Sequence, residues 1–203
     1  MKKVLVIAIA LTFALTACAL AGANPHGKLA IHLKAHPTSC TKGYPTFTAC
    51  TAINSHWANG GDLDAMPVFY DLTQYTVVET GLTWPVEWGS GSWTKCKGDL
   101  IIGTIINPGD GVAIAWTVCQ TGWGISPGYE WLAATDAGRV CPVVDPPTGD
   151  FGTVDCTPDP GPYYDRPTCI GCGGVLGAVG DDPCNLPSAA EPSTWGNIKT
   201  MFK

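Results

Sequence analysis

The amino-acid sequence predicts an all-β protein that folds as an antiparallel two-sheet sandwich. Short runs of apolar, β-branched and aromatic residues recur along the chain at roughly regular spacing, which is typical of strands. These runs are separated by segments rich in glycine and proline, of which the chain has 25 and 17. No strong amphipathic helical pattern occurs before Ser193. Strands and turns without helices favour an Ig-like or jelly-roll-like sandwich over residues 24–160.

Residues 28–36 form the first expected strand. Apolar side chains occupy alternate positions from Leu29 to Ala35, and lysines and histidines hold most of the positions between them. This period of two predicts one buried and one solvated face, and Pro37 ends the strand. Two further strands are expected at residues 68–73 and 75–84.

The clearest expected hairpin joins residues 99–106 to residues 112–119. The five residues between them, Asn-Pro-Gly-Asp-Gly, are typical of a turn. The first strand is apolar throughout, so we expect it to be buried on both faces. In the second strand, Val112, Ile114 and Trp116 share one face. Shorter strands are expected at residues 129–135, 139–145 and 153–156.

Residues 1–23 have the pattern of a secretory signal peptide. Two lysines follow the first methionine, an uncharged and mostly apolar run covers residues 4–17, and Ala-Gly-Ala at residues 21–23 provides a small-residue cleavage site. Asn24 is then the first mature residue. We therefore expect a secreted or cell-surface protein, either periplasmic or extracellular.

A second interpretation of this segment stays open. Leu15-Thr16-Ala17-Cys18 is similar to a bacterial lipobox, in which the cysteine is lipidated and becomes the mature N-terminus. We favour release over a lipid anchor at Cys18. A membrane-spanning mature chain is not expected, because the uncharged stretch ends without a basic stop signal.

Nine cysteines follow the signal segment, and export predicts that they form disulfides. They are Cys40, Cys50, Cys96, Cys119, Cys141, Cys156, Cys169, Cys172 and Cys184. Cys40 and Cys50 close a short loop and are expected to pair. Cys96 and Cys119 flank the main hairpin, and their pairing requires a bulge or bend.

The pairing of the last five cysteines has two solutions. Cys141 and Cys156 lie opposite each other if the chain folds back at the Pro-rich turn between them. Alternatively, Cys141 is unpaired, and the four cysteines after it pair among themselves in one of three ways. We favour this second partition, because a tail without regular strands needs local covalent closure. The Cys169-Ile-Gly-Cys172 spacing is then structural rather than a metal or redox site.

Four of the eight tryptophans lie in loop-like, Gly-rich surroundings: Trp57, Trp88, Trp93 and Trp123. Indoles at the loop edge of a sandwich can stack on sugar rings, which supports carbohydrate binding as an alternative function. The competing interpretation is that these indoles cover the ends of the core. Trp84 and Trp116 have strand positions and are expected in the core.

Composition and motifs exclude several classes of function. The net charge of −6 and the lack of a basic patch argue against nucleic acid as a partner. Neither a Gly-x-Ser-x-Gly elbow nor a His-Glu-x-x-His motif is present. On a strand, His32 and His36 lie about 13 Å apart, too far to share one metal ion. We therefore expect no catalytic residues, no cofactor and no metal site.

The chain ends in two segments that we place outside the sandwich. Residues 161–192 are rich in Cys, Gly and Pro and form an expected extension. In residues 193–203, Ser193 or Thr194 can cap a short amphipathic helix. Its apolar and basic side chains are Trp195, Ile198, Lys199, Met201, Phe202 and Lys203. This tail is interpreted either as an export or surface-sorting tag, or as a helix docked on its own sandwich.

Several motifs resemble those of uncharacterised secreted Cys-rich bacterial proteins that end in a Thr-Trp-Gly-x-Ile-Lys tail. The matching segments are residues 67–73, 101–103, 107–111, 119–120, 180–184 and 193–203. The resemblance covers most of the chain and implies export. It carries no activity, because no function is attached to the members it resembles.

The sequence therefore favours a non-enzymatic, disulfide-stabilised structural or interaction module of the cell surface or extracellular space. The alternative is a carbohydrate-binding module that uses the loop tryptophans. The expected partners are a surface glycan or another extracellular protein. The ligand and the oligomeric state are left open.

Overall fold

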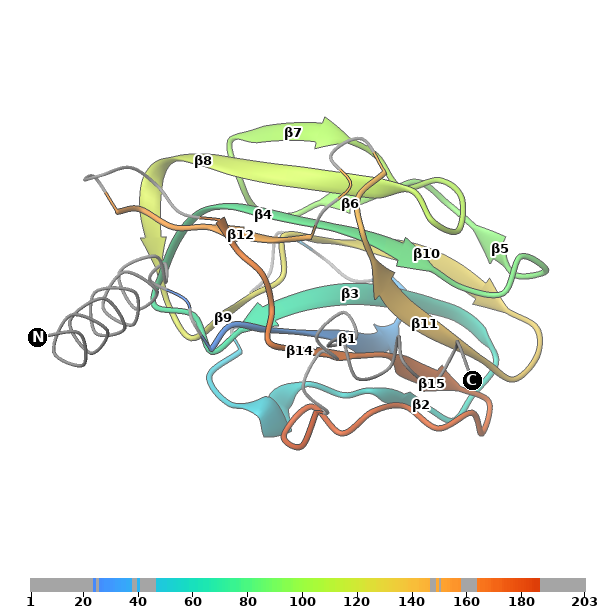
Figure 1. Ribbon diagram of the computed structural model, residues 1–203. Coiled ribbons are helices and arrows are strands. Elements are labelled where there is room, and N and C mark those ends of the chain that lie inside the picture. The colour runs from blue at the N-terminus through green and yellow to red at the C-terminus, as the bar shows by residue number, and fades with distance from the viewer. Residues whose placement is uncertain are drawn as a thin grey trace, which may run out of the picture.

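The computed structural model describes residues 24, 26–37, 40, 47–146, 149, 151–157 and 164–186. These residues form fifteen strands and one short 3-10 helix, η1 (Cys50–Ala52), and the strands build two mixed sheets that do not close into a barrel (Figure 1). The expected all-β sandwich is confirmed. The predicted signal segment (residues 1–23, with Cys18) and the tail residues Trp195, Ile198, Lys199 and Phe202 lie outside the described residues. No helix within the described ranges is long and apolar enough to span a membrane.

The first sheet contains seven strands. Its central path is β14 (Cys169–Gly171), β1 (Lys28–Ala35), β3 (Gly61–Tyr70), β10 (Gly128–Ala134) and β5 (Gly89–Ser90). Two short strands join this path, β6 (Thr94–Lys95) beside β10 and β9 (Gly124–Ile125) beside β3.

The second sheet contains eight strands. Its central path is β13 (Tyr164–Asp165), β12 (Gly152–Val154), β4 (Gln74–Thr83), β11 (Gly138–Val143), β15 (Gly173–Val175) and β2 (His56–Trp57). β8 (Gly111–Thr121) pairs with β4, and β7 (Leu100–Gly103) pairs with β8. One half of β11 pairs with β15 and the other half with β4, so β11 connects the two parts of this sheet.

The C-terminal segment is part of the sandwich rather than an extension of it. β14 pairs in parallel with β1, and β15 pairs in parallel with β2. The predicted boundary at residue 160 therefore does not separate the segment from the sheets. Strands of two or three residues leave no alternation in a sequence rich in Gly, Pro and Cys, so this contribution was not predictable from periodicity.

The core lies between the two sheets and contains the apolar face predicted for the first strand as far as Leu33, whereas Ala35 at the end of that strand is exposed. Leu29, Ile31 and Leu33 on β1 are buried, and so are Val78 and Leu82 on β4. These side chains belong to one cluster that draws on both sheets. The period of two in each strand therefore marks the face that packs inward.

Four disulfides staple the sandwich, and none is a pair that the sequence predicted. The bonds are Cys40–Cys96, Cys50–Cys184, Cys119–Cys156 and Cys141–Cys172. The predicted Cys40–Cys50 and Cys96–Cys119 pairs are wrong. Cys141, predicted to be unpaired, is bonded, and Cys169 is the one free cysteine among the described residues.

The sheet order explains these partners. The path β1, β3, β10 and β6 brings the chain after β1, with Cys40, to the chain after β6, with Cys96. Cys172 directly precedes β15, which pairs with β11, the strand that carries Cys141. Each bond thus joins neighbours in space that are distant along the chain, whereas the prediction relied on closeness in sequence.

Candidate functional site

β7 is an exposed edge strand, which corrects the prediction that it is buried on both faces. Leu100, Ile101 and Ile102 are 55%, 36% and 57% exposed. The strand pairs with β8 on one side, and no other described strand pairs with it. In Figure 1, β7 is the outermost strand at the top of the molecule. The first sheet therefore does not cover it, although its sequence is that of a buried strand.

The β7 edge lacks most of the features that keep an exposed edge strand from pairing with another strand. Residues 100–103 contain no charged side chain and no proline, the two features that most often block the addition of another strand. The strand is short, which limits how many hydrogen bonds a new partner strand can make.

The second surface feature is a large bulge in β8. Tyr75 of β4 pairs with Gln120, but Val77, two residues later, pairs with Ala115. Residues 116–119 of β8 therefore leave the ladder. A bulge of this kind redirects side chains and is common beside binding sites.

Two contacts hold the bulge in place. The Asp99 carboxylate accepts hydrogen bonds from the Thr117 amide and hydroxyl, both at 2.7 Å. These hydrogen bonds lower the pKa of Asp99 below its ordinary value. The Cys119–Cys156 disulfide ties the end of the bulge to the chain after β12.

A groove of about 380 Å³ lies between the β8 bulge and β9. Its lining includes Tyr75, Lys97, Trp116, Gln120, Thr121 and Trp123. The Trp116 ring meets the Tyr75 ring edge to face at 5.4 Å between centroids, and the Trp123 ring meets the Tyr70 ring at 5.2 Å. Both indoles are half-buried, so each is supported by the protein and still borders the groove.

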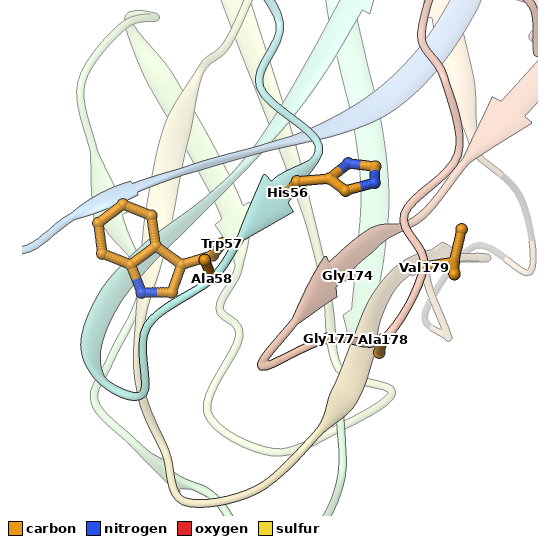
Figure 2. A pocket seen from close by; sticks show the side chains of 7 residues that line it. All are labelled: His56, Trp57, Ala58, Gly174, Gly177, Ala178 and Val179. Atoms are coloured by element: carbon orange, nitrogen blue, oxygen red, sulfur yellow. The ribbon is translucent and has the colours of Figure 1, made fainter.

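A smaller cavity of about 180 Å³ lies beside β2, and its lining residues are shown in Figure 2. His56, Trp57 and small residues between 174 and 179 line it. The His56 and Trp57 side chains point to opposite sides of β2. The Nδ1 atom of His56 lies 3.0 Å from the Ser55 hydroxyl. The cavity is below the range of about 300–1,000 Å³ that is usual for small-molecule sites.

The structure separates the four candidate stacking tryptophans into two groups. Trp88 and Trp93 are only 4% and 8% exposed and belong to the core, so they present no ring to a ligand. Trp57 and Trp123 are half-buried and each lines a cavity. Trp116, expected in the core, packs against the core cluster but is only half-buried, and it also lines the groove, a position that the sequence did not predict. The regular alternation from Val112 to Val118 gave no signal of the bulge.

Buried carboxyl groups are a further feature that the sequence did not reveal. Glu130 is fully buried, and neither of its oxygens has a hydrogen-bond partner among the described residues. Burial raises its pKa to about 8. Burial, and then the nearby Glu79, raise the pKa of Asp145 to about 6. None of these three acids lines either cavity.

The histidines of the first strand have structural contacts. The His32 ring is half-buried, its Nδ1 accepts a hydrogen bond from the Asn54 amide, and burial lowers its pKa to about 4. The Nδ1 atom of His36 lies 2.8 Å from the buried Asp64 carboxylate. Within the described part of the chain, no group of three or more His, Cys, Asp or Glu residues is placed to hold a metal ion.

Three surface features thus stand out among the described residues: the β7 edge, the groove beside the β8 bulge and the cavity beside β2. No protein-family model, no curated protein and no solved structure matches this chain. The functional inference therefore depends on the chemistry of these surfaces.

Proposed function

We propose that the protein is a non-enzymatic structural or interaction module of the cell surface or extracellular space. The four disulfides support an oxidising location, because such bonds persist outside the reducing cytosol. These bonds also stabilise the fold by restricting the unfolded chain. The exposed β7 edge is the observation that carries the interaction role.

The partner that best fits β7 is the same strand of a second copy. A strand added to β7 must place apolar side chains on both faces of the extended sheet, because Leu100, Ile101 and Ile102 are all exposed. β7 itself meets this requirement. Residues 100–103 carry no charge, so two antiparallel copies pair without like-charge repulsion. Because the strand is short, the association is weak and depends on a high local concentration.

Self-association of the purified chain tests this proposal. In sedimentation equilibrium, the wild type is expected to show a monomer–dimer equilibrium at high protein concentration. Ile102→Lys places a charge on the exposed edge and is expected to leave only monomer. Val86→Lys is the matched control, because Val86 is 77% exposed but lies outside β7. A wild type that stays monomeric, or equal loss of the dimer in both variants, would contradict the proposal.

A further inference from the structure

We propose that the groove beside the β8 bulge binds a chain of uncharged pyranose sugars. This inference does not depend on the pairing of β7, because the two features use different residues. The groove volume of about 380 Å³ lies within the range that is usual for small-molecule sites. The cavity beside β2 is about half that size.

The aromatic side chains supply the apolar part of a sugar site. A pyranose ring has a face of C–H groups that packs against a flat aromatic ring, while its hydroxyls point outward. Trp116 and Trp123 both border the groove and are half-buried. Their contacts with Tyr75 and Tyr70 hold the indoles in place. The site therefore offers large contact areas with little loss of side-chain entropy on binding.

The polar lining supplies partners for sugar hydroxyls. Thr48 and Thr121 contribute hydroxyls, Gln120 an amide and Lys97 an ammonium group. The Gln120 amide donates to the Val118 carbonyl at 2.9 Å, which orients the side chain. Groups of this kind can donate to or accept from sugar hydroxyls, which offsets the cost of removing those hydroxyls from water.

The charges favour an uncharged glycan over an acidic one. Lys97 is the one charged residue among the described residues that line the groove. The chain carries a net charge of −6, so a polyanionic ligand meets overall repulsion with a single compensating cation. An uncharged chain avoids this cost.

The backbone geometry favours a glycan over an extended peptide. A peptide that adds to a sheet needs an unpaired strand edge. β9, which forms one wall of the groove, is paired with β3 through Tyr70 and Gly124. Gly124 also forms a bridge with Phe47 on its other side. Both edges of β9 are thus used at Gly124, so an extended peptide cannot add to this wall of the groove as a further strand.

Chemical-shift mapping of the indole N–H signals tests the proposal. The full chain is titrated separately with four uncharged hexasaccharides: cellohexaose, xylohexaose, mannohexaose and chitohexaose. At least one is expected to shift the Trp116 and Trp123 signals and to leave Trp57 unchanged. Hexagalacturonate and a proline-rich decapeptide serve as the acidic and peptide probes.

Matched variants show whether the binding occurs in the groove. Trp123→Ala is expected to weaken the affinity about tenfold or more, whereas Trp57→Ala leaves it unchanged. Trp123 also packs against a small cluster that contains Phe47 and Tyr70, so circular dichroism checks that the variant is folded. Thr121→Val removes one exposed hydroxyl without touching the core and is expected to weaken binding several-fold.

Three results would overturn the inference. The first is that none of the four hexasaccharides shifts either groove signal. The second is that hexagalacturonate or the peptide binds more tightly than every uncharged sugar. The third is that Trp57→Ala weakens binding as much as Trp123→Ala does. None of these results bears on β7, whose test measures molecular mass.

Discussion

Glu130 carries a carboxyl group in a buried position, where ionisation of the group costs free energy. It lies on β10 opposite Ala65 of β3 and is fully buried. Burial raises its pKa to about 8, and Asp110 and Asp64 add smaller effects in the same direction. The Gly91 amide, which donates to the Trp131 carbonyl at 3.0 Å, lowers the pKa of Glu130, but by less than burial raises it. The folded protein therefore holds a proton on Glu130 near neutral pH.

This proton makes stability depend on pH. The pKa of Glu130 is about 8 in the folded chain, above its ordinary value of 4.5. The favourable contribution of this difference to the free energy of unfolding is therefore complete below pH 4.5 and is lost as the pH rises to 8. Asp145 has its midpoint in the folded chain at about pH 6, and His32 has its midpoint in the unfolded chain at pH 6.5, so both groups titrate only in part above pH 6.5, with opposite effects on stability. Between pH 6.5 and 8, the free energy of unfolding is expected to fall by on the order of 1 to 2 kcal/mol because of Glu130.

Urea unfolding of Glu130→Gln at several pH values checks this expectation. The amide has a similar shape and does not ionise, so the slope between pH 6.5 and 8 should largely disappear and stability at pH 8 should rise. Asp62→Asn, at an exposed position, is the control and should keep the wild-type slope. If Glu130→Gln retains that slope, Glu130 is not the titrating group.

The β8 bulge is an element whose geometry depends on one surface carboxylate. The Asp99 carboxylate accepts hydrogen bonds from both the Thr117 amide and the Thr117 hydroxyl. Because the pKa of Asp99 is lowered, the stabilisation of the folded protein by the Asp99 carboxylate is complete above pH 3.8, its ordinary pKa. It is lost as the pH falls through the lowered pKa. The bulge is thus expected to be stable throughout the neutral range.

Amide hydrogen exchange tests the role of Asp99. Asp99→Ala is expected to raise the exchange rate of the Thr117 amide about tenfold or more and to leave the Val112 amide, in the regular part of β8, unchanged. Asp182→Ala is a matched control, because Asp182 is another exposed carboxylate that accepts a backbone hydrogen bond, from Cys184. Unchanged Thr117 exchange in Asp99→Ala would show that the disulfide alone holds the bulge.

Across the whole molecule, the disulfides join parts of the chain that meet only after folding. Cys50 and Cys184 are 134 residues apart, and the other three bonds span 31 to 56 residues. Closing such loops restricts the unfolded chain strongly. The C-terminal segment is therefore held to the sandwich by two of these bonds, through Cys172 and Cys184, as well as by its strands.

Removal of the disulfide that closes the longest loop tests this role. The Cys50→Ser and Cys184→Ser double variant is expected to lose about 2 to 5 kcal/mol of unfolding free energy, measured in urea. Cys169→Ser should change little, because Cys169 forms no disulfide. Peptide mapping without reduction should recover the four cross-links with Cys169 alone alkylated. A Cys169 peptide found in a cross-link would contradict the pairing.

Local patterns were sufficient to predict the fold class and the main strands. The alternation from Leu29 to Leu33 marks the buried face of β1, and the Asn-Pro-Gly-Asp-Gly turn marks the β7–β8 hairpin. Each of these signals lies within about ten residues, because the side-chain period of a strand is a property of its own backbone. Cysteine-rich composition likewise predicted a stapled fold, and the described residues contain four disulfides.

Only the order of strands in space decided the rest. It determined that Cys141 bonds to Cys172, that the apolar β7 lies at an exposed edge, and that Trp116 turns toward a groove. The strand order also places β14 in the first sheet and β15 in the second, although the segment that contains them has no visible periodicity. Each outcome depends on contacts between residues far apart in the chain. Such contacts form because sheets must complete their hydrogen bonds and bury a shared core, and no local pattern records which segments will meet.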